Sequence, residues 1–94
     1  SETIRVLIVE REQLFRRGLA GCLAADAATE VVAAAGTADE GYRLADEHVP
    51  DVVLVGTTLQ DAPGLAAATE FRRRYPATPT IVVAAQESDD ELFA

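Results

Sequence analysis

Four short apolar runs most constrain how this chain can fold. Each run is as long as a β-strand, and all but the first, which carries Arg5, are nearly uninterrupted by polar residues. Such strands are typical of a parallel sheet with helices on both faces, because both sides of each strand are then buried. The runs occupy residues 4–9, 30–35, 51–55 and 80–84.

Helical spacing fills the first interval between these runs. Residues 13–25 place Phe15, Leu19, Cys22 and Leu23 on one apolar stripe. We expect this stripe to face the core, with Cys22 as a small buried hydrophobe. A single cysteine cannot form an internal disulfide.

Capping signals delimit the remaining helices. Thr37 to Glu40 forms a capping box, which predicts a second helix that stops before Pro50. A third helix is expected from residue 64 or 65 to Tyr75, where Pro76 ends it. Another capping box, Ser88 to Glu91, precedes Leu92 and Phe93 and predicts the start of a fourth helix.

This alternation predicts an α/β fold, a doubly wound parallel sheet with right-handed crossovers. Its last strand would expose Ile81, Val82 and Val83 beside an unpaired row of backbone groups. Natural domains seldom leave such an edge bare. We therefore expect further strands or a partner chain to cover it, and a symmetric dimer is the commonest arrangement of identical chains.

Composition narrows the possible functions. The 94 residues suffice for one domain, and the net charge of −8 disfavours direct contact with nucleic acid. No apolar run approaches the roughly 20 residues of a membrane helix, and the amino terminus lacks the pattern of a signal peptide. We expect a cytoplasmic protein without membrane contact.

Signals for catalysis are missing. The turn after the first strand, residues 10–13, has none of the glycines of a phosphate-binding loop, and no nucleophile elbow occurs. His48 lies at a helix end, where a cation is favoured, and the acidic residues 87–91 suit a helix start better than a metal site. We therefore expect no enzyme activity.

Several landmarks occur in a characteristic order along the whole chain. They are LFRRGL in the first helix, Pro50-Asp51 at the third strand, Asp61 and Gly64 in the following loop, and Tyr75-Pro76 before the fourth strand. This pattern resembles a response-regulator receiver domain of the NarL/LuxR-type subfamily. The resemblance implies a flavodoxin-like (CheY-like) fold with strand order 2-1-3-4, spanning residues 1–94. It also implies that the fifth strand and last helix lie beyond this chain, which would stop in or after the fourth helix.

The resemblance also identifies an altered phosphorylation pocket. Working receivers use two acidic residues after the first strand, and an aspartate ending the third, to hold Mg²⁺ and accept a phosphoryl group. Here the two acidic positions carry Glu10 and Arg11, the acceptor position carries Gly56, and the hydroxyl position ending the fourth strand carries Ala85. Since an acyl phosphate needs a carboxylate and Mg²⁺ needs several hard oxygen ligands, we expect neither phosphorylation nor Mg²⁺ binding, and no cofactor. Thr57 or Thr58 could replace the acceptor only with an activating base, which the sequence does not supply.

Two functions remain open for this pocket. The first is a regulatory domain of a bacterial transcription factor in a two-component system, acting without phosphorylation through protein contacts or dimerisation. In that subfamily a helix-turn-helix domain, which would bind DNA, follows the receiver. The alternative is a sensor in which Arg11, beside Gly56 and Thr57, binds an anionic small molecule. Arg11 could instead pair with Glu10, Asp61 or both and fill the metal pocket as an internal counter-ion.

Overall fold

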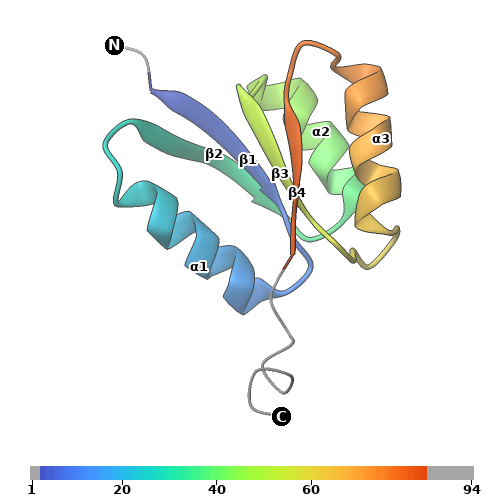
Figure 1. Cartoon of the computed structure of the whole chain (residues 1–94), viewed down its shortest axis with the longest axis horizontal. Coiled ribbons are helices and arrows are strands. Elements are labelled where there is room, and N and C mark those ends of the chain that lie inside the picture. The colour runs from blue at the N-terminus through green and yellow to red at the C-terminus, as the bar shows by residue number, and fades with distance from the viewer. Residues whose placement is uncertain (1–2, 85–94) are drawn as a thin grey trace.

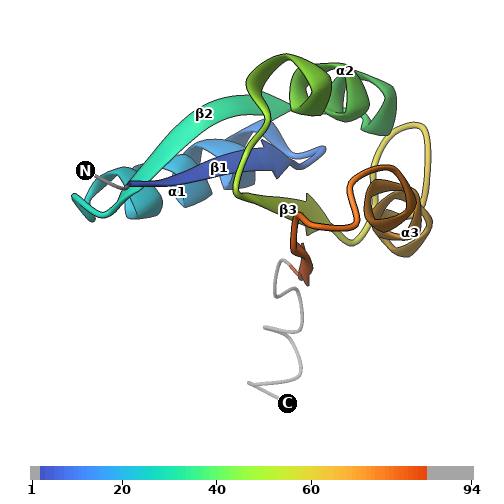
Figure 2. The same cartoon turned by 90° about the horizontal axis from the view of Figure 1, so that it is seen from above.

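The computed structural model describes residues 3–84, which form one parallel sheet with helices on both faces (Figures 1 and 2). The fold class predicted from the apolar runs is confirmed, and the predicted element ends differ from the observed ones by at most one residue. The elements are β1 (Ile4–Val9), α1 (Gln13–Ala24), β2 (Thr29–Ala35), α2 (Ala38–His48), β3 (Val52–Gly56), α3 (Gly64–Arg74) and β4 (Thr80–Val83).

The strands lie in the order β2-β1-β3-β4, as the resemblance implied. All three strand pairs are parallel, and Val9 lies opposite Val55 where β1 and β3 pair. Continuing that register by one residue brings Glu10 beside Gly56 at the carboxyl ends of the strands. These two residues therefore lie at the carboxyl ends of the strands, where parallel sheets usually display ligand-binding groups.

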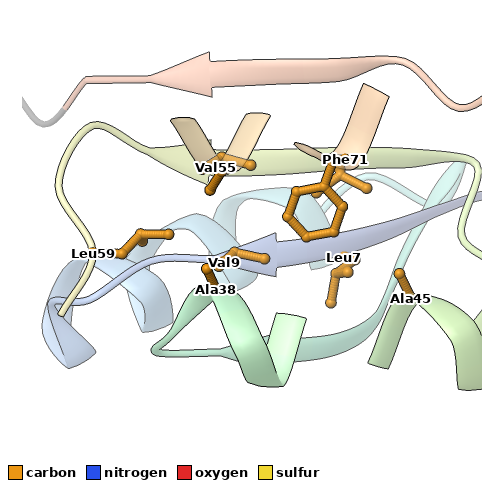
Figure 3. Close-up of a cluster of buried hydrophobic side chains, with 9 residues drawn as sticks. Leu7, Val9, Ala38, Ala45, Val55, Leu59 and Phe71 are labelled. Carbon is orange, nitrogen blue, oxygen red and sulfur yellow. The ribbon is translucent and has the colours of Figure 1, made fainter. Parts of the chain in front are cut away.

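The larger core lies between the sheet and the helices α2 and α3 (Figure 3). Leu7 and Val9 of β1 point to this side with Val53 and Val55 of β3, because alternate residues of a strand share a face. Phe71 of α3 is fully buried among them. The core is composed of Leu7, Val9, Ala38, Ala45, Val53, Val55, Leu59, Ala67 and Phe71.

Helix α1 covers the opposite face by itself, against β1 and β2 (Figure 1). None of its residues is buried, so the predicted apolar stripe is only half-buried at Phe15, Leu19 and Leu23. The prediction of a buried Cys22 is wrong, because this thiol is exposed. The half-buried residues of α1 are thus Phe15, Leu19 and Leu23 of the stripe, and Cys22 is not among them.

The predicted cap of α2 is confirmed. The side chain of Thr37 accepts a hydrogen bond from the backbone N–H of Glu40 at 3.2 Å. At its other end α2 stops at Val49, whose backbone is left-handed with φ of 47°. Arg5 of β1 steadies this turn by donating from Nη1 to the carbonyl oxygens of His48 and Val49 at 2.6 and 2.9 Å.

Strand β4 is an edge strand of the described sheet. Ile81 is 51% exposed, whereas Val82 and Val83 are half-buried. The predicted cap at Ser88, with Leu92 and Phe93, lies outside the described residues. Within residues 3–84 no helix is long and apolar enough to cross a membrane.

Candidate functional site

The candidate site lies where β1 and β3 end, at Glu10 and Gly56. Glu10 is only 5% exposed, and its Oε2 accepts a hydrogen bond from the backbone N–H of Glu12 at 2.7 Å. This bond offsets part of the cost of burying a carboxylate. The other carboxylate oxygen, Oε1, points at Gly56.

Gly56 has no room for a side chain in this arrangement. A Cβ added to its backbone would lie 2.1 Å from Oε1 of Glu10, well inside the closest approach of real atoms. The Glu10 carboxylate therefore occupies the space in which a residue at position 56 would begin its side chain. Glutamate reaches this space because it is one methylene longer than aspartate.

The loop after β3 also depends on a glycine. A Cβ on Gly64 would lie 1.9 Å from the carbonyl oxygen of Gly56, so only glycine permits this approach. The N–H of Gly64 donates to the carbonyl of Thr57 at 2.8 Å, and Thr58 bridges to Pro63. Thr57 itself is exposed at the rim of the site.

Arg11 does not enter the pocket. Its guanidinium is about half exposed and pairs with the neighbouring Glu12 at 3.3 Å. The suggested pairing of Arg11 with Glu10 or Asp61 is therefore wrong, since both carboxylates bind backbone N–H groups elsewhere. Rotation of a long exposed side chain toward its sequence neighbour costs less than desolvating the charge in the pocket.

Asp61 joins the loop after β3 to the start of α2. Its two carboxylate oxygens accept hydrogen bonds from the backbone N–H groups of Ala38 and Asp39 at 2.8 and 3.1 Å. These bonds, first that from Ala38, lower the pKa of Asp61 below its usual value. Asp61 is thus a helix cap in this structure.

Arg16 is a site residue that the sequence did not reveal, because arginines on a helix are usually solvated. Its Nη1 donates to the backbone carbonyl of Glu10 at 2.7 Å, and a Cβ on Gly36 would lie 3.1 Å from the same atom. Arg16 therefore fixes the turn that carries Glu10. The small residue Gly36, directly after β2, was the only signal for this contact.

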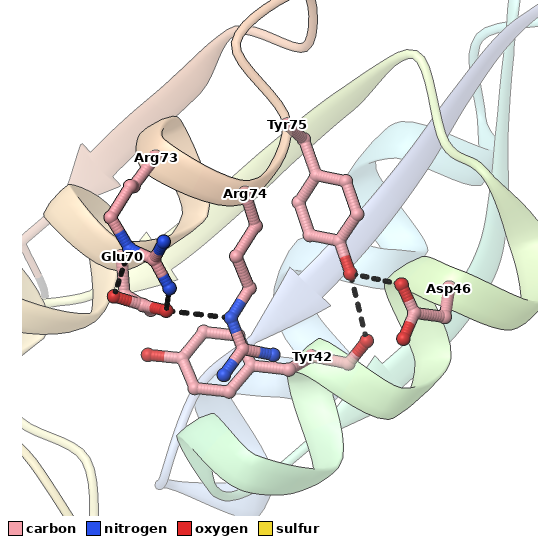
Figure 4. A network of polar contacts seen from close by, with 6 residues as sticks. All are labelled: Tyr42, Asp46, Glu70, Arg73, Arg74 and Tyr75. Carbon is pink, nitrogen blue, oxygen red and sulfur yellow. Dashed lines mark hydrogen bonds and ion pairs between the residues drawn. The ribbon is translucent and has the colours of Figure 1, made fainter.

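A polar network joins α2 to α3 at the other end of the sheet (Figure 4). Arg74 lies over the ring of Tyr42, 4.2 Å from its centroid, and bonds to Glu70 at 2.7 Å. Arg73 also pairs with Glu70, and the hydroxyl of Tyr75 donates to Asp46. Within the arginine run 72–74, Arg74 thus contributes to a contact between helices, whereas Arg73 pairs within α3.

These contacts shift several pKa values. The hydrogen bonds from Arg73 and Arg74 lower the pKa of Glu70 to about 2. Burial, followed by the hydrogen bond to Asp46, raises the pKa of Tyr75 above its usual value. Burial likewise raises the pKa of Tyr42. The network is therefore held in its charged and hydrogen-bonded form at neutral pH.

The described residues bring together only part of the predicted site. Glu10 and Gly56 are in contact, whereas Arg11 and Thr57 lie exposed at the rim and Asp61 faces α2. Ala85 lies outside the described residues. Within residues 3–84 no three histidine, cysteine, aspartate or glutamate side chains gather as a metal site would require.

Comparison with known proteins places the chain among receiver domains. Residues 6–94 match the family model described as response regulator receiver domain. The transcriptional regulatory protein LiaR of Bacillus subtilis is 33% identical over 90 residues, which cover 96% of this chain and 43% of that protein. A protein-glutamate methylesterase/protein-glutamine glutaminase of Paramagnetospirillum magneticum is 37% identical over 89 residues, covering 95% of this chain and 25% of that protein. The chain thus spans less than half the length of these curated relatives.

Solved structures agree with this placement. A two-component response regulator of the LuxR family from Aurantimonas sp. SI85-9A1 superposes with a TM-score of 0.82 at 29% identity, over 97% of this chain and 66% of that one. The fold, the order of the strands and the sequence matches lead to one conclusion. This chain belongs to the response regulator receiver domain family.

Proposed function

We propose that this chain is the regulatory receiver domain of a bacterial LuxR-type transcriptional regulator and that it works without aspartyl phosphorylation. The observation that carries this proposal is the contact between Glu10 and Gly56. The position that would carry the acceptor has no carboxylate, and the carboxylate of Glu10 fills the space where one would begin.

The residues of the site do not fit Mg²⁺. The cation needs several hard oxygen ligands in near-octahedral geometry. Glu10 offers one carboxylate, of which one oxygen is bonded to the N–H of Glu12. Both carboxylate oxygens of Asp61 accept hydrogen bonds from backbone N–H groups of α2. At the second acidic position the chain carries Arg11, which is positively charged.

Phosphorylation is tested by incubating the chain with acetyl phosphate and Mg²⁺ and measuring its intact mass. We expect no phosphoryl adduct on the natural chain. Formation of an acyl phosphate, recognised by its lability to hydroxylamine, would overturn the proposal.

Two variants test why the site is inactive. Gly56→Asp alone should stay unmodified, because its Cβ would have to displace the end of the Glu10 side chain and Arg11 would still occupy the second acidic position. Gly56→Asp combined with Glu10→Asp and Arg11→Asp shortens the obstructing side chain and restores two acidic positions, and it should gain the adduct and Mg²⁺ affinity. Equal labelling of both variants would contradict the role of Glu10.

Self-association through the edge of β4 is proposed for the 94-residue chain alone, because the resemblance implies a fifth strand that would follow in a longer gene product. Ile81 lies exposed on this strand, and edge strands pair readily with other chains. Sedimentation of the chain over a range of concentrations should show a monomer–dimer equilibrium that Ile81→Lys weakens. Leu65→Lys is the matched control, because Leu65 is an exposed leucine on α3. A monomer at every concentration would contradict this part of the proposal.

The resemblance to LuxR-type regulators further implies a helix-turn-helix domain that binds DNA. We propose that the natural gene product carries it after the receiver. The intact mass of that product from its host, with peptide mapping beyond Ala94, tests this expectation. A product that ends near Ala94 would contradict it.

A further inference from the structure

A pocket of about 180 Å³ lies at the opposite end of the sheet from Gly56. It is bounded by the end of α2, the start of β3 and the segment after α3. An apolar cavity of roughly 150 Å³ is large enough to hold benzene. The walls are mainly apolar and include Ala45, Asp46, Val49, Pro50, Val53 and Tyr75.

Val49 is held in an unfavourable state at this pocket. It is a β-branched residue in the left-handed region, with φ of 47°, and it is 70% exposed. Such a conformation is costly for valine, and strained residues tend to cluster at ligand sites. The hydrogen bonds from Arg5 to the carbonyls of His48 and Val49 maintain the turn, so the pocket keeps an open apolar wall.

The polar part of the pocket is negative. Of the described residues that line it, Asp46 alone carries a charge. Oδ1 of Asp46 accepts the hydrogen bond from Tyr75, which orients the carboxylate, and within residues 3–84 no hydrogen bond reaches Oδ2. Two cations on neighbouring elements are already engaged, since Arg74 is bonded to Glu70 and Arg5 to backbone carbonyls.

We propose that this pocket binds a small apolar amine, with one ring against the apolar wall and its ammonium group on the Asp46 carboxylate. The ring matches the volume and lining of the pocket, and the ammonium group matches its single charge. A net charge of −8 on the chain favours the same class of ligand over anions. This site is independent of the phosphorylation state discussed above, because it lies at the other end of β3.

The test is a titration of the ¹⁵N-labelled chain with benzylamine, followed by amide chemical shifts. Benzyl alcohol has nearly the same shape without the charge, and benzoate has the opposite charge. We expect benzylamine to shift the amides of Ala45, Val53 and Thr78 with a Kd on the order of 1 mM, as suits so small a ligand. Benzyl alcohol should bind about threefold to tenfold more weakly, and benzoate should leave these amides unmoved.

Three variants separate charge from shape. Asp46→Asn keeps an acceptor for the Tyr75 hydroxyl. It should lower the affinity for benzylamine to the affinity for benzyl alcohol. Asp39→Asn removes an exposed carboxylate from the same helix without touching the pocket, and should leave the affinity unchanged. Val49→Gly relieves the left-handed strain and removes an apolar wall, so it should weaken both ligands while the chain remains folded.

The proposal is overturned by any of three results. The first would be pocket amides that stay unmoved at about 10 mM benzylamine, roughly ten times the expected Kd. The second would be benzoate shifting the same amides as strongly as benzylamine does. The third would be an Asp46→Asn variant that binds benzylamine as well as the natural chain does.

Discussion

The two faces of the sheet are built differently. Helices α2 and α3 enclose a continuous core around Phe71 and are also joined by polar contacts, whereas none of the residues of α1 is itself buried. Leu14 on α1 is 83% exposed. The comparison indicates that most of the folding free energy of the described residues comes from the α2/α3 face, because hydrophobic stabilisation follows the apolar area removed from water.

The largest test of this comparison is the removal of one aromatic ring from each face. Phe71→Ala should lower the free energy of unfolding by about 3–5 kcal/mol, because the ring is fully buried and leaves a cavity. Phe15→Ala on α1 should cost only about 1–2 kcal/mol, since that ring is half-buried. Urea unfolding measures both. Equal losses would show that the α1 face carries as much stability as the other.

Two helical glycines provide the next test. A Cβ on Gly41 of α2 would lie 2.8 Å from Val9 Cγ2 and 3.2 Å from Phe71 Cζ, whereas a Cβ on Gly18 of α1 meets nothing within 4 Å. Gly41→Ala should therefore destabilise by about 1–3 kcal/mol through overpacking. Gly18→Ala should stabilise by up to about 1 kcal/mol, because alanine favours a helix. Thermal unfolding distinguishes the signs, and a stabilising Gly41→Ala would contradict the close packing of α2.

The sequence predicted the order of the elements but not how tightly each helix packs. Apolar runs and caps report where strands and helices begin, so β1 and the cap at Thr37 were correctly predicted. The exposure of Cys22 could not be inferred, because an apolar stripe does not reveal how much sheet is available to cover it. Helix α1 is therefore only half-buried, although its apolar stripe predicts a face that packs on the core.

In the candidate site, too, the sequence predicts which residues are present but not how every side chain is oriented. The sequence shows directly that position 56 is a glycine without a carboxylate, and the pairing of β1 with β3 places Glu10 beside it. That the longer glutamate would fill the vacated space could have been suspected from this pair of residues. The orientation of the Arg11 side chain toward Glu12 could not have been predicted, because an exposed arginine has many rotamers of similar energy.

A smaller effect is expected at the link between the loop after β3 and α2. Asp61→Ala removes the acceptor of two N–H groups at the start of α2 and should cost about 1 kcal/mol. Because the pKa of Asp61 is lowered in the folded state, its contribution is present above the usual aspartate pKa and is lost as the pH falls through the lower value. Asp61→Asn retains one acceptor and should lose less. Identical stabilities of all three chains near pH 7 would show that this cap is unimportant.

The smallest expected effect concerns the ion pairs on the exposed side of α3. The pKa of Glu70 falls from 4.5 to about 2, so its stabilisation is complete above pH 4.5 and disappears as the pH falls toward 2. Glu70→Gln should flatten the decline of stability in that window, and high salt should reduce the difference from the natural chain. Glu47→Gln is the matched control, since Glu47 on α2 pairs more loosely with Arg43, at 3.4 Å. If the two variants have the same acid unfolding profile, the network adds nothing specific, and the α2/α3 face owes its advantage to the core around Phe71 alone.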